Sequence, residues 1–383
     1  MTLLTVALLS LAIWLYLVVL HNRFWWASER DDRVLPPPPA TWPSVVAVVP
    51  ARDEADVVAR SIGSLLAQDY PGPFRVILVD DGSSDGTAEA ARAAASDLGR
   101  GDRLEVMRAA PLAAGWTGKL AAVSQGIARA TAEHAPTYLM LTDADIGHAP
   151  DALAKLVRRC EAGGLALASI MVKLHCSTAA ERCLIPAFVF FFQMLYPFPT
   201  VNRPGSRLAA GAGGCMVARA EALERAGGIA AIRGALIDDC TLAALLKKQG
   251  AIWLGLTETS WSLRPYTTVG QVGRMVSRSA YAQLNYSPWL LAGTILGMGL
   301  TYLTPPLLAV FGHGWARGAG LAAWLLMALS FQPTLRLYRR SPLWGLALPA
   351  IGAAYCGFTV QSALDTWAGR GGMWKGRAQA MAS

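Results

Sequence analysis

Long stretches without a charged side chain occur at both ends of this 383-residue chain. The first covers residues 1–22, and three more cover residues 279–316, 318–335 and 341–364. About 20 apolar residues are enough to cross a bilayer as a helix, so each stretch has the length of a membrane span. A single soluble core rarely needs so many windows so close together. We therefore predict membrane helices at both ends and a globular domain between them.

The N-terminal stretch has the features of an uncleaved anchor rather than those of a signal peptide. No basic residue precedes it, whereas Arg23, two tryptophans and Arg30 follow it. A signal peptide normally begins with a basic region and ends at a cleavage site of small residues. Basic and aromatic residues after a span indicate its cytoplasmic end. We therefore expect residues 1–22 to form an anchor whose N-terminus lies outside.

A further apolar stretch, residues 184–202, contains Pro186, Pro197 and Pro199 between aromatic residues. Prolines interrupt helical hydrogen bonding, so this segment suits the membrane interface better than a complete span. Residues 23–278 would then form one cytoplasmic catalytic domain that includes this interfacial segment.

The C-terminal region is expected to hold membrane helices over residues 279–366 and a cytoplasmic tail over residues 367–383. Three complete crossings would place Arg370, Lys375 and Arg377 outside, against the preference of basic residues for the cytoplasmic side. One window, within residues 286–335, is therefore expected to be re-entrant or interfacial.

The charge balance limits the possible partners of the chain. Lys and Arg total 34 against 26 Asp and Glu, which gives a net charge of +8, although charged residues make up only 16%. No patch interleaves basic with aromatic residues as nucleic-acid binding requires, so we expect membrane lipids rather than nucleic acid as partners. The six cysteines form no C-x-x-C pair, which disfavours a zinc site and suits reduced thiols in the cytoplasm.

The segment between the membrane stretches alternates β-branched runs with amphipathic ones. Strands are predicted at residues 44–49, 74–79, 104–107 and 138–141, and helices at 53–68, 85–95, 119–130, 152–160 and 241–248. Such alternation predicts an α/β fold with a mostly parallel sheet covered on both faces. Ligands of such sheets bind at the carboxyl ends of the strands.

Acidic side chains cluster at these predicted strand ends and before the last helix. They occur in Pro50-Ala-Arg52-Asp53-Glu54, Asp80-Asp81-Gly-Ser-Ser-Asp85, Asp143-Ala-Asp145 and Asp238-Asp239. Each motif alone also fits a tight turn or a helix cap. Alternate residues of a strand share a face, so Asp143 and Asp145 suit one divalent cation, Mg²⁺ or Mn²⁺, with a diphosphate completing its shell. Together, at one edge of one sheet, the motifs favour a binding site.

In this order the motifs resemble those of family 2 glycosyltransferases, which are inverting enzymes with the GT-A fold that use nucleotide-diphosphate sugars. Other segments are more narrowly similar to hopanoid-biosynthesis-associated glycosyltransferases, a group related to ceramide glucosyltransferases. They are Gly115-Trp-Thr-Gly-Lys119, Gly211-Ala-Gly-Gly-Cys-Met216, Tyr281-Ala-Gln-Leu-Asn-Tyr-Ser-Pro288 and Trp374-Lys-Gly-Arg377. The resemblance to family 2 glycosyltransferases covers residues 44–278 and implies a GT-A, Rossmann-like, mostly parallel sheet domain. The narrower resemblance implies N-terminal and C-terminal transmembrane helices.

The resemblance also implies roles for individual residues. Asp239 would be the catalytic base, and Arg274 would stabilise the leaving group. Donor binding would involve Pro50, Arg52, Glu54, Asp80, Asp81, Lys119, Asp143, Trp374 and Arg377. Asp143 and Asp145 would hold the metal, and Asp238, Gln271 and Arg278 would lie on the acceptor side. Residues 271–275 resemble the Q-x-x-R-W motif with Met275 in place of the tryptophan that stacks on sugar acceptors, which favours a lipid hydroxyl acceptor.

The implied function is a membrane-bound inverting glycosyltransferase of hopanoid biosynthesis that moves a sugar from a nucleotide-diphosphate sugar, expected to be a UDP-sugar, to a lipid hydroxyl. Polyprenyl phosphate, a ceramide-like lipid or diacylglycerol remain alternative acceptors. A non-catalytic membrane scaffold that binds nucleotide-sugar or lipid remains a second alternative. The expected location is the bacterial inner membrane, with several membrane passes and the catalytic domain in the cytoplasm.

Overall fold

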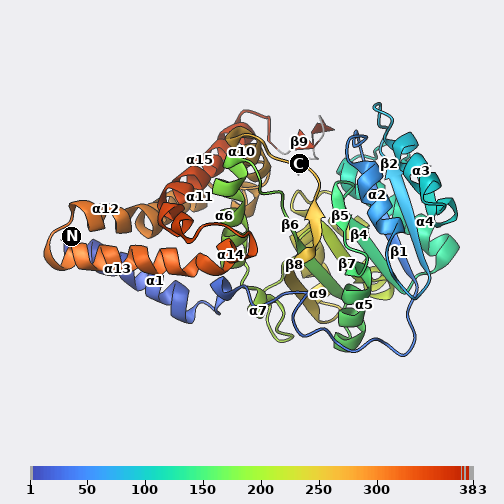
Figure 1. Ribbon diagram of the computed structural model, residues 1–383. Helices are drawn as coiled ribbons and strands as arrows, with labels where there is room; N and C mark the ends of the chain where they lie inside the picture. Colours follow the sequence, from blue (N-terminus) through green and yellow to red (C-terminus); the bar gives the residue numbers. More distant parts are fainter. Residues whose placement is uncertain (1–2, 372, 375–376, 379–383) are drawn as a thin grey trace. The chain divides into compact units, whose positions relative to one another are not determined.

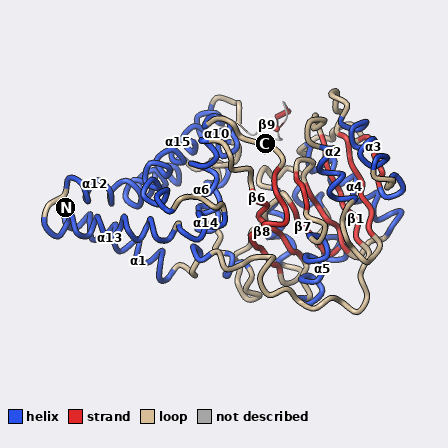
Figure 2. Tube along the Cα trace, viewed as in Figure 1, coloured by secondary structure: helices blue, strands red, loops and turns tan. Residues whose placement is uncertain are grey.

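The computed structural model describes residues 3–371, 373–374 and 377–378 (Figures 1 and 2). The chain divides into two compact units, each assembled from segments that are distant in the sequence. A helical unit contains Met1–Ser28, Cys176–Thr200 and Pro265–Gly372. A sheet unit contains Glu29–His175, Val201–Arg264 and Met373–Ser383.

The sheet unit is built on an eight-stranded sheet in the order β3-β2-β1-β4-β7-β6-β8-β5. Its strands are β1 (Val45–Ala51), β2 (Phe74–Asp80), β3 (Leu104–Arg108), β4 (Tyr138–Thr142), β5 (Ile146–His148), β6 (Leu167–Lys173), β7 (Cys215–Arg219) and β8 (Ile252–Ser262). Strands β3, β2, β1 and β4 run parallel, β7 is antiparallel to both of its neighbours, and β6 pairs in parallel with β8. The predicted α/β class is confirmed, and the four predicted strands form its parallel half.

Helices cover this sheet on both faces, as Figure 1 shows for α2, α3, α4 and α5. The sheet unit contains α2 (Val58–Leu66), α3 (Thr87–Asp97), α4 (Gly118–His134), α5 (Ala152–Gly163), α8 (Ala220–Arg225) and α9 (Asp238–Lys247), with short 3₁₀ turns η3 (Gly101–Arg103) and η4 (Ile229–Ile232). Strand β1 is buried along its whole length, which explains its run of valines. Helix α2 begins later than the predicted residue 53, because the preceding residues form a loop at the end of β1.

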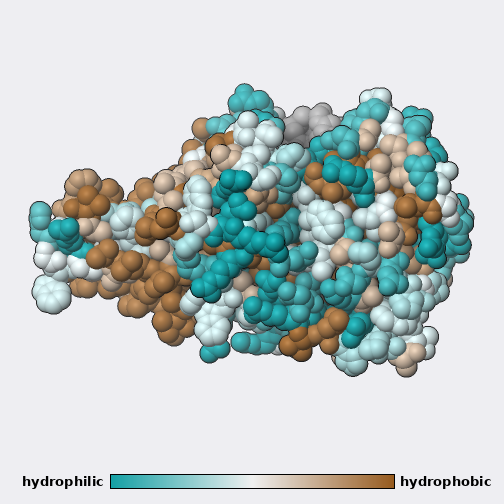
Figure 3. Space-filling model, in the orientation of Figure 1, coloured by the Kyte–Doolittle hydropathy of each residue, from teal (hydrophilic) through white to brown (hydrophobic). Residues whose placement is uncertain are grey.

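Within the described residues, the helical unit contains five helices with the length and composition of a membrane span. They are Leu3–Leu20, Ala179–Val201, Pro288–Phe311, Gly314–Leu337 and Pro342–Trp367. Their constituent elements are α1 (Leu3–Leu15), η1 (Tyr16–Leu20), α6 (Ala179–Leu195), α7 (Phe198–Val201), α11 (Pro288–Met298), η6 (Gly299–Leu303), α12 (Thr304–Phe311), α13 (Gly314–Ser330), α14 (Gln332–Leu337), η7 (Pro342–Ala347) and α15 (Leu348–Trp367). The remaining elements are η2 (Phe24–Trp26), α10 (Val269–Ser277) and η5 (Ala282–Leu284). Hydrophobic side chains gather on the surface over α1, α12 and α13 (Figure 3).

Helix α1 packs against the hairpin formed by α12 and α13, and its polar side chains are satisfied there. The Ser10 hydroxyl donates to the Leu300 carbonyl at 2.9 Å, and the Trp14 indole N–H donates to the Thr301 carbonyl at 2.7 Å. Both carbonyls belong to the π-helical turn η6, whose wider winding changes the normal helical hydrogen bonding. Interhelical hydrogen bonds of this kind stabilise helix association where water is absent.

The segment that contains the C-terminal helices begins and ends at the same side of the helical unit. The Tyr281 and Trp367 rings lie 5.8 Å apart, and the Tyr281 N–H donates to the Ser362 hydroxyl at 3.0 Å. Gly352, near the start of α15, lies against the ring of Tyr302 in the middle of the Pro288–Phe311 helix. The α12–α13 hairpin therefore leads the chain away from the side that carries Tyr281 and back toward it. Helix α15 then runs beside α11. Pro288–Phe311, Gly314–Leu337 and Pro342–Trp367 are each long and apolar enough to cross a membrane, so the re-entrant or interfacial window within residues 286–335 stays a prediction.

Two predicted boundaries differ from the observed units. Helix α6 continues through Pro186, and its aromatic residues Phe190 and Phe191 are buried against Phe331 and Tyr302 of the helical unit. Residues 23–28 and 265–278 of the predicted catalytic domain belong to the helical unit as well. The predicted domain of residues 23–278 therefore contains segments of both units.

Candidate active site

The loops after β1 and β2 interlock at the carboxyl edge of the sheet. Asp53 has a positive φ of 50°, a conformation that Asp tolerates better than most residues. Its N–H donates to the Ser83 hydroxyl at 2.9 Å, and its carboxylate accepts the Ser84 N–H at 3.0 Å. The neighbouring Glu54 N–H donates to the Thr87 hydroxyl at 2.8 Å. These contacts fix the directions in which the acidic side chains of both loops point.

The adjacent carboxylates Asp80 and Asp81 are compensated by groups of the protein itself. Asp81 is buried and lies 3.6 Å from the Arg52 guanidinium, which also donates to the Asp81 carbonyl. Asp80 accepts the Ser83 N–H at 3.1 Å and the Ser83 hydroxyl. Asp80 also lines a cavity of about 280 Å³ at the ends of β2 and β3, which Thr87, Arg92 and Arg108 help to form. Asp80 is thus directed toward a cavity large enough to hold a ligand group.

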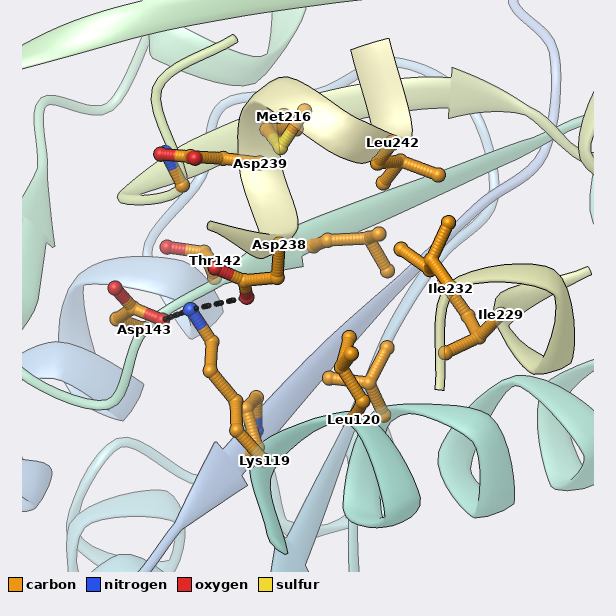
Figure 4. Close-up of a pocket in the computed structure, with 14 residues that line it drawn as sticks. Lys119, Leu120, Thr142, Asp143, Met216, Ile229, Ile232, Asp238, Asp239 and Leu242 are labelled. Carbon is orange, nitrogen blue, oxygen red and sulfur yellow. Dashed lines mark hydrogen bonds and ion pairs between the residues drawn. The ribbon is translucent and has the colours of Figure 1, made fainter. Parts of the chain in front are cut away.

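Lys119 joins two of the acidic motifs in a second cavity (Figure 4). Thr117 caps α4, which places Lys119 in the first turn of this helix. Its Nζ atom lies 2.9 Å from Asp143 Oδ1 and 3.1 Å from Asp238 Oδ2. Burial acts to lower the pKa of Lys119, but the two carboxylates outweigh it and hold this pKa above its usual value. Lys119 therefore stays charged. Pro50, from the end of β1, lines the same cavity.

Asp239 points away from Lys119 and toward the loop before β7 (Figure 4). Its two carboxylate oxygens accept the Gly213 N–H at 2.9 Å and the Cys240 N–H at 2.7 Å. A Cβ atom at Gly213 would lie 3.4 Å from the Asp239 carboxylate, so the loop passes close to it. Burial, followed by repulsion from the Asp238 carboxylate, raises the pKa of Asp239 to about 6. A fixed carboxylate with a pKa in this range suits general-base catalysis near neutral pH.

Asp145 lies next to a cation that the sequence analysis did not identify. The Arg264 Nε atom lies 3.4 Å from Asp145 Oδ2, and the same guanidinium pairs with Glu54. Burial and the carboxylates of Asp143 and Glu54 raise the pKa of Asp145 to about 6, although Arg264 acts in the opposite direction. Arg264 belongs to no recognisable sequence motif. The pairing of β5 with β8 places it beside Asp145.

The carboxylates of Asp143 and Asp145 fit a hard divalent cation by their chemistry. Both side chains supply oxygen ligands. The neighbouring carboxylates that help to raise the Asp145 pKa also give the site an excess of negative charge, which a cation would offset. Among the described residues, Glu105, Glu133 and His134 are the one group of three or more His, Cys, Asp or Glu side chains whose ligand atoms all lie within 4.8 Å of one another, and Asp143 and Asp145 do not belong to it. Arg129 already pairs with both glutamates of that cluster, so it is an ordinary surface ion-pair group.

The structure brings most of the predicted site residues into the sheet unit, at the carboxyl edge of the sheet. These are Pro50, Arg52, Glu54, Asp80, Asp81, Lys119, Asp143, Asp145, Asp238 and Asp239. Gln271, Arg274 and Arg278 belong to the segment that forms α10 in the helical unit, where Gln271 forms a capping box with Thr268. Trp374 and Arg377 belong to the two-residue strands β9 (Met373–Trp374) and β10 (Arg377–Ala378), and their side chains lie outside the described part of the structure.

Comparison with known proteins finds a family model and solved structures that this chain resembles. The family model of Glycosyl transferase family 2 matches residues 46–227. The mannosyltransferase PcManGT from Pyrobaculum calidifontis, solved in complex with GDP-Man and Mn²⁺, is 19% identical with a TM-score of 0.56, and the alignment covers 95% of this chain and 99% of that one. Glucosyl-3-phosphoglycerate synthase from Mycobacterium tuberculosis, solved with Mn²⁺ and uridine-diphosphate-glucose, is 19% identical over 63% of this chain and 78% of that one, with a TM-score of 0.40. No curated protein matches by sequence. The predicted GT-A fold is confirmed.

Proposed function

We propose that this chain, whose residues 46–227 carry a glycosyl transferase family 2 domain, is a membrane-bound inverting glycosyltransferase that moves a sugar from a nucleotide-diphosphate sugar to a lipid hydroxyl. The observation that carries this proposal is the single cavity in which Lys119, Asp143, Asp238 and Asp239 meet. A candidate base, a lysine ammonium and a carboxylate that can bind a metal ion all line this cavity. A scaffold without catalysis would have no need for this combination.

In the proposed reaction Asp239 accepts the proton of the acceptor hydroxyl, whose oxygen then attacks the anomeric carbon of the donor sugar. The bond from that carbon to the diphosphate breaks on the opposite face, which inverts its configuration. The Gly213 and Cys240 N–H groups hold the Asp239 carboxylate in one orientation. Lys119 offers a fixed positive charge to the departing diphosphate. Positioning and stabilisation of the leaving group therefore supply the catalysis.

The donor would occupy the carboxyl edge of the sheet. Asp143 and Asp145 would hold Mg²⁺ or Mn²⁺, which supplies positive charge for the departing diphosphate. Near Asp80, the cavity of about 280 Å³ has room for a nucleobase. We further propose Arg52, Glu54 and Asp81 as supports of the donor site. Arg274 is proposed to stabilise the departing diphosphate, and Trp374 and Arg377 are proposed to take part in donor binding.

A lipid acceptor is supported by the apolar helices and by the motif at residues 271–275. Exposed apolar side chains such as Leu296 and Phe311 belong to helices long enough to cross a bilayer. Met275 replaces the tryptophan that would stack on a sugar, so a saccharide acceptor lacks its platform. The resemblance to hopanoid-associated enzymes makes a hopanoid hydroxyl the first acceptor to test, with Asp238, Gln271 and Arg278 proposed on the acceptor side.

The acceptor is tested with purified protein, labelled UDP- and GDP-sugars and Mn²⁺ in mixed micelles. We expect sugar transfer to a hydroxylated hopanoid, and product NMR should show an anomeric configuration opposite to that of the donor. Parallel arms contain diacylglycerol, a ceramide-like lipid or polyprenyl phosphate. Preferred transfer to one of these would replace the hopanoid acceptor, whereas a product of retained configuration would contradict the inverting mechanism.

We also propose that the end of the helical unit that carries Tyr281 and Trp367 faces the cytoplasm of a bacterial inner membrane. Arg278 and Arg370 lie toward this end, whereas the hairpin tip between α12 and α13 carries exposed Trp315 together with Arg317, whose Nε atom donates to the Ala309 carbonyl at 3.1 Å. Positive charge favours the cytoplasmic side of a membrane protein. Tyr281 and Trp367, at the two ends of the C-terminal segment, lie together. One orientation of the helical unit in the membrane therefore places both Arg278 and Arg370 on the cytoplasmic side.

Cysteine labelling of intact cells tests this orientation. We expect Trp315→Cys to react with a membrane-impermeant maleimide from outside, and Arg370→Cys to react only after permeabilisation. The unsubstituted protein, which has six cysteines, gives the background. Labelling of Arg370→Cys in intact cells would reverse the proposed topology.

A further inference from the structure

Arg264 follows the end of β8 and reaches several carboxylates at the candidate metal site. Its guanidinium pairs with Glu54, and its Nη1 atom lies 3.6 Å from Asp56 Oδ2. Its Nε atom lies 3.4 Å from Asp145 Oδ2. The planar guanidinium has donors in fixed directions, so it can bridge more than one carboxylate, which a lysine ammonium does less well.

Backbone pairing holds Arg264 beside Asp145. Strand β5 pairs with β8 so that Ile146 lies opposite Ser262, and the Leu263 N–H donates to the Asp145 carbonyl at 2.8 Å. The segments that carry the two side chains are thus joined by hydrogen bonds of the main chain. The pair does not depend on a flexible surface loop, and its side chains are mostly buried, with 30% of Arg264 and 22% of Asp145 exposed.

Several carboxylates at this site share the Arg264 guanidinium. Glu54, Asp56 and Asp145 share this one guanidinium, while Lys119 is engaged by Asp143 and Asp238. The Arg264 Nε atom lies 3.4 Å from Asp145 Oδ2, which is longer than a usual N–H···O hydrogen bond. Asp145 is therefore the carboxylate that can be taken over by a second cation, while Glu54 keeps the arginine anchored.

We propose that Arg264 is a resident counterion that competes with the divalent metal for Asp145 and so makes tight metal binding depend on the donor diphosphate. This inference rests on the proposed function, because it takes Asp143 and Asp145 as the metal ligands. Two cations that share one carboxylate repel each other. The negative charge of a diphosphate offsets both, so metal and nucleotide should each strengthen the binding of the other.

The test measures Mn²⁺ binding to the purified full-length protein by electron paramagnetic resonance of free Mn²⁺, first alone and then with UDP or GDP. We expect Arg264→Gln to bind Mn²⁺ alone at least tenfold more tightly than the wild type, equivalent to about 1.4 kcal/mol. The gain in Mn²⁺ affinity on adding nucleotide should shrink by a similar factor. Arg30→Gln is the matched control, because Arg30 also joins two carboxylates, Asp32 and Glu258, and should leave Mn²⁺ binding unchanged.

A second substitution covers the case in which Arg264→Gln does not fold. Arg264→Lys keeps the charge but not the planar fork, so its Mn²⁺ affinity without nucleotide should lie between those of the wild type and Arg264→Gln. Unchanged or weaker Mn²⁺ binding in the folded variants would overturn the inference while leaving the proposed function intact. By contrast, Mn²⁺ binding that is insensitive to Asp145→Asn in every variant would contradict the proposed function, and this inference with it.

Discussion

Replacement of Asp239 by Asn is expected to reduce sugar transfer by about 10²–10⁴-fold, the usual contribution of a general base. The amide is similar in size but accepts no proton at neutral pH. It retains one acceptor oxygen for the Gly213 or Cys240 N–H, so the loop before β7 should stay close to its position. Initial rates are measured with labelled donor and the lipid acceptor, and nucleotide binding and the thermal unfolding midpoint are measured on the same preparation.

The pH dependence of the wild type provides a second measurement on the same carboxylate. A general base must be deprotonated to act, and the pKa of Asp239 is raised to about 6. Transfer should therefore fall as the pH decreases below about 6, approaching a tenfold loss per pH unit, and should level off above it. Asp239→Asn should lose this acidic limb along with most of the rate.

Asp238→Asn is the informative neighbour. The Asp238 carboxylate contributes to the raised pKa of Asp239, so its removal should move the acidic limb to lower pH. At pH 8, where Asp239 is deprotonated in both proteins, the rate should change much less than in Asp239→Asn. If Asp238→Asn instead abolishes transfer and Asp239→Asn preserves it, the base is Asp238.

The parallel half of the sheet could be predicted from the sequence because its strands are buried on both faces. Valine-rich runs such as that of β1 end at turn residues, which gives a local signal. The sequence signal of strand β8 is weaker, because Gly255 interrupts its run of hydrophobic residues and Glu258 is exposed. Its role depends on pairing with β6 and β5, which are distant in the chain. Long-range pairing of this kind leaves no periodic pattern in a single sequence.

The acidic half of the site was predictable for a similar reason, since each carboxylate follows a recognisable strand or begins a helix. The cationic half of the site was only partly predictable from the sequence. Lys119 belongs to a motif, whereas Arg264 is separated by 210 positions from Glu54, its partner. The helical unit shows the same limit. The prolines and aromatic residues of residues 184–202 predicted an interfacial helix, but they gave no sign that Phe190 and Phe191 of α6 are buried among neighbouring helices.

Replacement of Asp145 by Asn is expected to remove most of the Mn²⁺-dependent increase in nucleotide affinity and to lower transfer by about 10³-fold, the scale of losing one electrostatic stabiliser of the leaving group. The amide keeps an oxygen but loses the charge that a hard cation requires. Asp151→Asn is a suitable control, because Asp151 also pairs with a cation, Lys155 at 2.7 Å, and follows in the same stretch of chain.

Metal rescue separates a ligand role for Asp145 from a structural one. A thiolate prefers softer cations than a carboxylate does, so Asp145→Cys should be inactive with Mg²⁺ and regain part of its transfer activity with Cd²⁺. The wild type should show the opposite preference. Because Arg264 lies against Asp145, a merely structural loss would be repaired by neither ion. An Asp145→Cys variant that is equally impaired with Mg²⁺, Mn²⁺ and Cd²⁺, although folded, would remove Asp145 from the metal site and leave its contact with Arg264 as its function.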